Sequence, residues 1–230
     1  METNNNSVVK TSTPMELEVG EDISLWWPTP IYDRVLEGWK DVNLELISII
    51  MEKKENDAGI QRSNIGGWHS DEQFFAWKNP AVEQVRRWVK AAFKEVTLLT
   101  TNGSGFSGQG NLLGWVNVSE MGDYNNVHIH PNCVWSGVYY VEVGTPSDKR
   151  PFSGQIYFLD PRSGSGYQIA PFNVFGNCKS IKPQNGQMLM FPSWLQHGVR
   201  PYDGEGERIS IAFNILLPNP GMAASMPVVT

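Results

Sequence analysis

The second half of the chain is divided into many short apolar runs, and this feature limits the possible fold most strongly. After about residue 110 the helical spacing of apolar residues ends, and short apolar or alternating runs follow, separated by Gly, Pro, Asn and Asp. Many short strands with turn signals between them are typical of a β-sandwich or β-barrel. The predicted strands are 112–118, 127–130, 134–143, 155–159, 187–191 and 209–216. The sequence therefore predicts a mainly β fold.

Two amphipathic helices are predicted ahead of this β region. From about residue 38 onward, and again after Pro80, apolar residues recur at spacings of three and four. Asn79 can cap the second helix, and Pro80 suits its first position. We expect this helical region, about 38–97, to brace one sheet of the β core, about 110–217, from outside.

The remaining segments differ from this core in composition. Residues 1–22 are polar and predict a flexible leader, so that 23–230 form one domain, a length that β-sandwiches and β-barrels often reach. Residues 160–184 are rich in Gly, Ser and Asn and predict a long loop, which in a compact domain is usually functional or mobile. The tail, 218–230, is predicted to be extended.

Composition narrows the classes of function. The formal net charge of −6 disfavours nonspecific binding to nucleic acid or to anionic membranes. Cys133 and Cys178 do not form a disulfide framework, and the sequence shows neither a signal peptide nor an apolar run that spans a bilayer. We therefore expect a soluble, cytoplasmic protein without membrane or nucleic-acid partners. Prolines in the N-terminal arm make a homodimer plausible.

Three of the four histidines fall in the β region. His128 and His130 are two residues apart in a predicted strand, where positions i and i+2 face the same side, so both imidazoles are expected to point into one space. His197 follows a later strand that ends in a proline turn. Each signal alone is weak, because strand histidines are often surface or structural residues. Together they predict a metal site.

An arginine and a serine follow the last histidine. Arg208 and Ser210 are also two residues apart in a predicted strand and are expected to share a face. A guanidinium is well shaped to hold a carboxylate at two points. Alone, such a pair is typical of an ordinary strand arginine in a surface ion pair. The order of the three histidines, Arg208 and Ser210 on successive strands instead favours a metal site with a neighbouring carboxylate clamp.

This order resembles the iron(II)- and 2-oxoglutarate-dependent oxygenases, whose double-stranded β-helix carries H-x-D/E, a later His and then Arg or Lys. More narrowly, the chain is similar to a family of 2-oxoglutarate/iron(II) oxygenases found in bacteria and bacteriophages. The matching phrases are Trp27-Pro28-Thr29-Pro30-Ile31, Ser63-Asn64-Ile65-Gly66-Gly67-Trp68-His69-Ser70, His128-Ile129-His130-Pro131, Ser136-Gly137-Val138-Tyr139-Tyr140, Phe158-Leu159-Asp160-Pro161-Arg162, Phe191-Pro192-Ser193-Trp194 and Arg208-Ile209-Ser210-Ile211.

The resemblance implies a jelly-roll or cupin-like sandwich with two N-terminal bracing helices, in a bacterial cell or in a host cytoplasm if phage-encoded. It implies that His128 and His197 bind iron(II). It also implies that Arg208, with Ser210, binds the distal carboxylate of 2-oxoglutarate. Tyr140 stands where a tyrosine of the superfamily often hydrogen-bonds that carboxylate, although adjacent tyrosines in a strand are often core residues.

One position departs from the broader superfamily. His130 stands where most members have Asp or Glu, and this removes one negative charge from the metal ligands. We favour a face of three histidines. Two alternatives stay open: His130 does not bind the metal directly, or a carboxylate such as Asp123 or Asp160 turns in. Three neutral ligands also suit zinc or copper.

The reaction that the resemblance implies consumes 2-oxoglutarate and dioxygen, yields succinate and carbon dioxide, and hydroxylates a second substrate. One rival interpretation is a three-histidine metal-binding jelly roll without 2-oxoglutarate chemistry. Another is a structural or sugar-binding jelly roll in which the histidines are incidental. The glycine-rich segment 64–70 is expected to be either a rim over the site or a structural turn with a core tryptophan.

Overall fold

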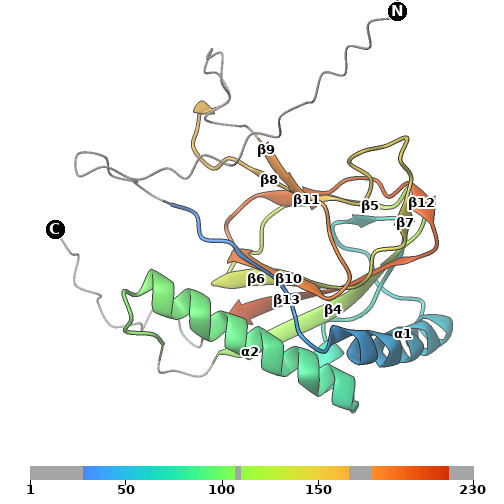
Figure 1. The fold of residues 1–230 in the computed structure, drawn as a ribbon, viewed down its shortest axis with the longest axis horizontal. Coiled ribbons are helices and arrows are strands. Elements are labelled where there is room, and N and C mark those ends of the chain that lie inside the picture. Colours follow the sequence, from blue (N-terminus) through green and yellow to red (C-terminus); the bar gives the residue numbers. More distant parts are fainter. Residues whose placement is uncertain (1–27, 107–109, 166–177, 218–230) are drawn as a thin grey trace, which may run out of the picture.

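The structure, a computed structural model, describes residues 28–106, 110–165 and 178–217 (Figure 1). Its helices and strands alternate little: most helical residues precede most strands. The elements are β1 (Tyr32–Val35), α1 (Trp39–Asn56), β2 (Asn64–Ile65), β3 (Trp68–His69), η1 (Phe74–Ala76), α2 (Pro80–Thr100), β4 (Asn111–Ser119), β5 (Tyr124–His128), β6 (Trp135–Glu142), β7 (Thr145–Pro146), β8 (Ile156–Leu159), β9 (Cys178–Ile181), β10 (Gln187–Pro192), β11 (His197–Val199), β12 (Gly204–Glu205) and β13 (Arg208–Leu216).

Two antiparallel sheets form the layers of a sandwich (Figure 1). The larger sheet has the strand order β1-β10-β6-β13-β4-β3, and the smaller sheet has the order β2-β5-β11-β8-β9. The chain passes from one layer to the other between β4, β5 and β6 and again between β10 and β11, which is typical of a double-stranded β-helix, whereas β8 and β9 lie in the same layer. The predicted mainly β jelly roll is confirmed.

Both helices cover the outer face of the larger sheet, so the predicted brace is also confirmed (Figure 1). Asn79 caps α2, because its side chain accepts a hydrogen bond of 2.7 Å from the backbone N–H of Ala81. Asn43 ties α1 to β6 by donating to the carbonyl of Val141 at 2.6 Å and accepting from the Tyr139 hydroxyl at 2.6 Å. These bonds satisfy polar groups that the helix packing buries.

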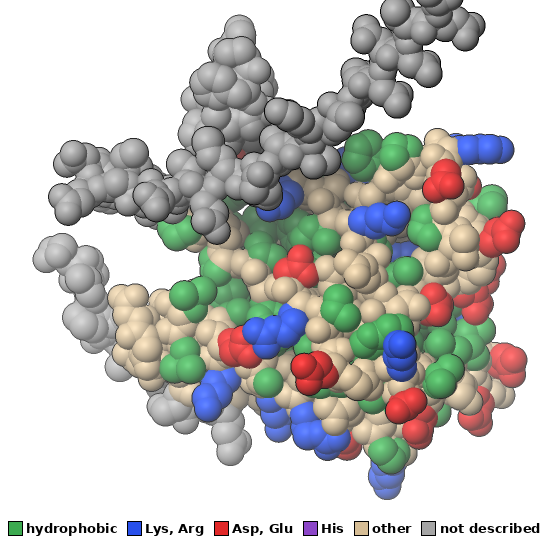
Figure 2. All heavy atoms as spheres, viewed as in Figure 1, with side chains coloured by type: hydrophobic (Ala, Val, Ile, Leu, Met, Phe, Trp, Pro, Cys, Tyr) green, Lys and Arg blue, Asp and Glu red, His purple; other side chains and the backbone are tan. Residues whose placement is uncertain are grey.

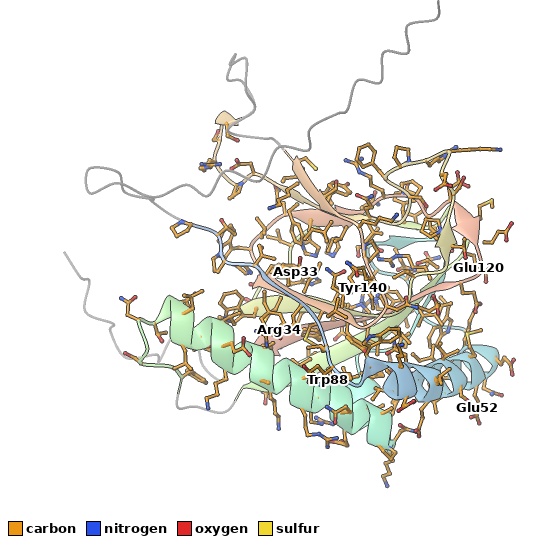
Figure 3. All side chains as sticks on the ribbon, viewed as in Figure 1. Asp33, Arg34, Glu52, Trp88, Glu120 and Tyr140 are labelled. Carbon is orange, nitrogen blue, oxygen red and sulfur yellow. The ribbon has the colours of Figure 1, made fainter. Side chains whose placement is uncertain are left out.

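Strand β6 contributes side chains to both hydrophobic clusters of the molecule. Tyr139 belongs to the cluster between the helices and the larger sheet, where Trp88 of α2 packs on it at 5.4 Å between ring centroids. Tyr140 belongs to a smaller cluster between the two sheets. Figure 3 shows Trp88 next to α2 and Tyr140 in the interior of the sandwich. Because successive side chains of a strand point to opposite faces, Tyr139 points toward the helices and Tyr140 points toward the space between the sheets.

Parts of the connection pattern differ from the sequence prediction. Within the predicted loop 160–184, Cys178–Ile181 form β9 and pair with β8, so the loop assignment is wrong for these residues. This strand lies at a sheet edge and has exposed or half-buried residues, so it lacks the apolar alternation that would have revealed it. The segment that precedes α1 contributes an edge strand, β1, which pairs with β10.

The predicted leader, 1–22, and tail, 218–230, lie outside the described residues. Among the helices of the described ranges, none is long and apolar enough to cross a membrane.

Candidate active site

Three histidines meet between the sheets. His128 and His197 are direct partners in the pairing of β5 with β11, and their ring centroids are 4.5 Å apart. The ring of His130 lies 4.9 Å from that of His128 and 5.2 Å from that of His197. One ring nitrogen from each histidine lies within 4.8 Å of the others, a spacing at which a single metal ion can be held.

His130 reaches this cluster in a way that the sequence did not predict. Strand β5 ends at His128, so the assignment of His130 to the same strand is wrong. The following residue, Pro131, has no N–H to continue a ladder. Instead, the backbone N–H of His130 donates to the carbonyl of Ser193 at 3.0 Å, which keeps this segment beside the turn after β10. The predicted convergence of the two rings is nevertheless observed.

Backbone carbonyls set the tautomers of two histidines. Nδ1 of His128 lies 2.7 Å from the carbonyl oxygen of Asn126, and Nδ1 of His197 lies 2.8 Å from that of Leu195. A carbonyl oxygen only accepts hydrogen bonds, so Nδ1 of both rings carries the proton and donates. The Nε2 atoms of His128 and His197 therefore keep a free lone pair, which is what a metal ion requires.

The cluster is electrically neutral at neutral pH. Burial lowers the pKa of all three imidazoles. Burial and the neighbouring His128 lower the pKa of His130 to about 4, and burial with the adjacent histidines lowers that of His197 to about 3. Because metal binding needs unprotonated imidazole, no proton has to be displaced near neutral pH.

Neither carboxylate considered from the sequence joins the histidines. Asp123 accepts a hydrogen bond of 2.7 Å from the backbone N–H of Glu120, and Asp160 pairs with Arg162 at 2.6 Å. Among the described residues, the only metal-capable group of three or more side chains is the histidine cluster. The described geometry thus favours three histidines over a ligand set that includes Asp123 or Asp160.

Arg208 is a buried cation in the same interior. Its side chain is 2% exposed, Nε donates to the carbonyl of Gly154 at 3.2 Å, and Nη1 donates to the Ser210 hydroxyl at 3.4 Å. Within the described ranges, no carboxylate lies within the 4.0 Å of an ion pair with this guanidinium. A buried charge without an opposite charge is costly, so this arginine is a candidate binding residue for an anionic ligand.

Tyr140 lies against Arg208. The guanidinium carbon is 5.3 Å from the centre of the Tyr140 ring, and the side chain is fully buried. Burial raises the pKa of Tyr140 to about 12, against the opposing influence of Arg208, so the hydroxyl keeps its proton. This hydroxyl has no hydrogen-bond partner within the described part of the chain. A buried donor of this kind next to an unpaired cation again points to a missing acceptor.

One pocket joins these two parts of the site. The three histidines, Arg208, Ser210 and Tyr140 all line it, so the structure brings together every site residue predicted from the sequence. Apolar side chains complete the wall around them. These are Trp115, Val138, Ile156, Phe191, Val199 and Ala212.

Sequence reasoning missed the polar residues of the wall. Asn117 of β4 is the pairing partner of Ser210, lines the pocket, and has a buried Oδ1 without a hydrogen-bond partner among the described residues. Asn125 and Ser63 also line the pocket, and Nδ2 of Asn125 donates to the hydroxyl of Ser63 at 3.4 Å. The signal for Asn117 was present, because a lone amide interrupts the apolar run of its strand.

The segment 64–70 has a structural role. Trp68 is buried in the core beneath the helices, and its indole N–H donates to the carbonyl of Asp57 at 2.7 Å. Gly66 adopts a φ of +71°, and a side chain there would collide with the carboxylate of Asp123. Of the two interpretations of this segment, the structural turn with a core tryptophan is the one observed.

Residues 114–214 match the model of a family described as "Putative 2OG-Fe(II) oxygenase". This range contains all three clustered histidines, Arg208, Ser210 and Tyr140. Comparison with curated protein sequences found no match.

Solved structures with the same fold come from several organisms. A prolyl-4-hydroxylase of Pseudomonas putida has a TM-score of 0.56 at 15% identity, over 82% of this chain and 92% of that one. A prolyl hydroxylase of Trichoplax adhaerens, in complex with a peptide fragment of hypoxia inducible factor, has a TM-score of 0.53 at 12% identity, over 82% and 83%. HygX of Streptomyces hygroscopicus, solved with nickel and 2-oxoglutarate, has a TM-score of 0.53 at 14% identity, over 83% of each chain.

Proposed function

We propose that this chain, whose residues 114–214 match the 2OG-Fe(II) oxygenase family, binds iron(II) through three histidines and 2-oxoglutarate through Arg208, and hydroxylates an organic second substrate. The observation that carries the proposal is a single pocket that contains both the histidine cluster and a buried arginine without a carboxylate partner among the described residues. A metal-binding protein without a carboxylate co-substrate has no need for such an arginine, so this observation favours the oxygenase over the plain metal protein.

The residues present fit both groups chemically. Three neutral imidazoles suit a divalent transition metal and leave coordination positions open. The buried guanidinium and the unpartnered Tyr140 hydroxyl are donors that await an acceptor, and a carboxylate accepts from both. Without a protein carboxylate, the metal keeps its full positive charge, which favours a dianionic co-substrate such as 2-oxoglutarate.

The protein contributes position and environment. His128, His130 and His197 would hold the metal, Arg208 and Ser210 would bind the far carboxylate of 2-oxoglutarate, and Tyr140 would donate to the same group. Iron(II), 2-oxoglutarate and dioxygen supply the oxidation, in which 2-oxoglutarate loses carbon dioxide to become succinate and the second substrate gains an oxygen atom. The apolar wall of the pocket would exclude water from these reactants.

Hydroxylation is the reaction type that we infer. Two of the proteins that share the fold are a prolyl-4-hydroxylase and a prolyl hydroxylase, and they support this inference by analogy. The analogy concerns the reaction type and not proline as the substrate, because a common fold hosts many substrates.

Succinate formation tests the proposal. The purified protein, supplied with iron(II), ascorbate and 2-oxoglutarate, is expected to form succinate slowly even without its second substrate, and the variant His197→Gln is expected to lose both bound iron and succinate formation. His69→Gln is the matched control, because His69 is also buried but lies outside the cluster. Iron binding without succinate would favour the plain metal protein, and no iron binding would favour a structural or sugar-binding jelly roll.

A further inference from the structure

Asn214 contacts His130, the one clustered histidine whose ring no backbone carbonyl of the described residues holds. It lies on β13, is 7% exposed, and its Nδ2 is 3.3 Å from Nδ1 of His130. Its Oδ1 accepts a hydrogen bond of 2.7 Å from the hydroxyl of Ser136, its pairing partner on β6. Ser136, Asn214 and His130 thus form a buried chain that ends at the metal cluster.

This contact differs in kind from those of the other two histidines. Carbonyl oxygens accept from Nδ1 of His128 and His197 and leave only one possible tautomer for each ring. An asparagine side chain can either donate or accept. In the observed orientation Nδ2 donates to His130, so Nδ1 of His130 is the acceptor and the proton of the neutral ring resides on Nε2.

A neutral imidazole with its proton on Nε2 cannot use that atom as a metal ligand. Nδ1 of His130 is occupied by Asn214, so Nε2 is the nitrogen left for a metal. Turning the amide by about half a turn would place Oδ1 against Nδ1, which would move the proton to Nδ1 and free the lone pair of Nε2. Ser136 permits both orientations, because a hydroxyl accepts as readily as it donates.

We propose that Asn214 is a positioning residue that determines, through the orientation of its amide, whether His130 acts as a metal ligand. In this inference, which rests on the metal site of the proposed function, the observed orientation of the amide keeps the proton of His130 on Nε2 and so opposes metal binding by that atom. Metal binding turns the amide and moves the proton to Nδ1. Trp115 packs on the His130 ring at 5.7 Å between centroids and helps to hold the ring in place while its proton changes position.

This arrangement gives a role to the position at which the chain departs from the H-x-D/E pattern. A carboxylate ligand has no tautomers, whereas a histidine at this place must be held in one of them. Residues that hydrogen-bond to a metal-binding histidine typically change metal affinity by about 10- to 100-fold when they are replaced. Asn214, on the apolar strand β13, is the side chain that contacts His130 and can determine which tautomer it adopts.

Zinc(II) is a suitable probe, since it is diamagnetic and binds three-histidine sites. Nitrogen NMR of protein labelled with ¹⁵N-histidine is expected to show the His130 proton on Nε2 in the metal-free wild type and on Nδ1 in the zinc-bound wild type. In Asn214→Asp the carboxylate only accepts, so Nδ1 is expected to carry the proton in both states. Zinc affinity is then expected to rise about tenfold in Asn214→Asp and to fall about tenfold in Asn214→Leu.

Asn117→Asp is the matched control, because it adds the same charge on β4, in the wall of the pocket that the three histidines line. If it raised zinc affinity as much as Asn214→Asp, the gain would come from charge alone and the inference would be overturned. An Nδ1 proton on His130 in the metal-free wild type would also overturn it. Failure of the wild type to bind zinc would instead overturn the metal site itself, and with it the inference.

Discussion

At the scale of single residues, two adjacent tyrosines show how surroundings assign roles to identical side chains. Tyr139 and Tyr140 are both fully buried, but the Tyr139 hydroxyl donates to Asn43 at 2.6 Å, whereas the Tyr140 hydroxyl has no partner in the described part of the chain. The first bond stabilises the attachment of α1 to β6. The unpaired hydroxyl is a cost to the folded protein that a ligand would offset.

Replacing each of the two tyrosines by phenylalanine tests these roles. Tyr140→Phe is expected to keep or raise the free energy of unfolding, by up to about 1 kcal/mol, since it removes an unsatisfied polar group. It is also expected to raise the KM for 2-oxoglutarate about tenfold through loss of a hydrogen bond to a charged group. Denaturant unfolding and succinate assays measure the two effects.

Tyr139→Phe is the control, and the reverse pattern is expected for it. It would lower the free energy of unfolding by about 1 kcal/mol, because Asn43 loses its donor, and leave the KM for 2-oxoglutarate unchanged. If both variants lost stability equally and neither changed the KM, Tyr140 would be an ordinary core residue.

The buried histidine His197 makes stability depend on pH. Its pKa is about 3 in the folded protein against about 6.5 in the unfolded chain, so the unfolded chain binds more protons between these values. The free energy of unfolding of chelator-treated protein is therefore expected to fall as the pH drops, by about 1.5 kcal/mol between about pH 6.5 and 5 from this residue alone.

Denaturant unfolding at several pH values checks this, with His197→Gln as the comparison. The variant lacks the titrating group, so its stability should change less across the same interval, where most Asp and Glu side chains stay ionised. Parallel pH curves for the two proteins would show that His197 does not carry the dependence.

At the scale of elements, the sequence predicted what local pattern and composition determine. The apolar spacing and the Asn79-Pro80 signal defined α2, and the apolar runs defined strands such as β6 and β13. Edge strand β9 was missed, because it is polar and depends on its neighbour β8 rather than on its own pattern.

The residues of the candidate site were likewise predicted where sequence order or resemblance marks them, and missed where their role depends on tertiary contacts. The histidines, Arg208 and Ser210 were found from their order on successive strands, and Tyr140 from family resemblance. Asn117 and Asn214 were missed, because an amide that interrupts an apolar strand marks an unusual position but does not indicate what its side chain faces. Ser210, which is opposite Asn117 in the strand pairing, and His130, which Asn214 contacts, lie on segments distant in sequence. Their positions are set by the strand register and by tertiary packing.

Helix α2 provides the test at this scale. Asn79→Ala removes the cap on the Ala81 N–H and also the contact of Asn79 with Glu45, so it is expected to lower the free energy of unfolding by about 1 kcal/mol. Asn79→Ser retains a capping oxygen and should recover most of that loss. Equal destabilisation by both variants in denaturant unfolding would show that the cap contributes little.

At the scale of the whole molecule, charge and layering direct ligands to the interior. Basic and acidic side chains are interspersed on the face shown in Figure 2, in keeping with the net charge of −6. The buried positive charge of Arg208 instead lies between the sheets. Anion recognition is therefore expected inside the sandwich, where water screens charge least.

Because the metal would bridge β5, β11 and the segment after β5, its binding should stabilise the whole domain. A ligand that binds only the folded state at 100 times its dissociation constant adds about 2.7 kcal/mol to the free energy of unfolding. Anaerobic iron(II) is expected to raise the Tm of the wild type by several degrees in a thermal melt. His197→Gln should show almost no rise, and equal rises would place the iron elsewhere.

The measurement that tests the central claim most directly is an anaerobic titration of metal-free protein with iron(II) and then 2-oxoglutarate, followed by visible absorption. The wild type is expected to develop a charge-transfer band on addition of 2-oxoglutarate. The variant Arg208→Ala should require at least tenfold more of it, and the exposed-arginine control Arg34→Ala should match the wild type. Iron binding without any response to 2-oxoglutarate would contradict the account, as would an Arg208→Ala titration that coincides with that of the wild type.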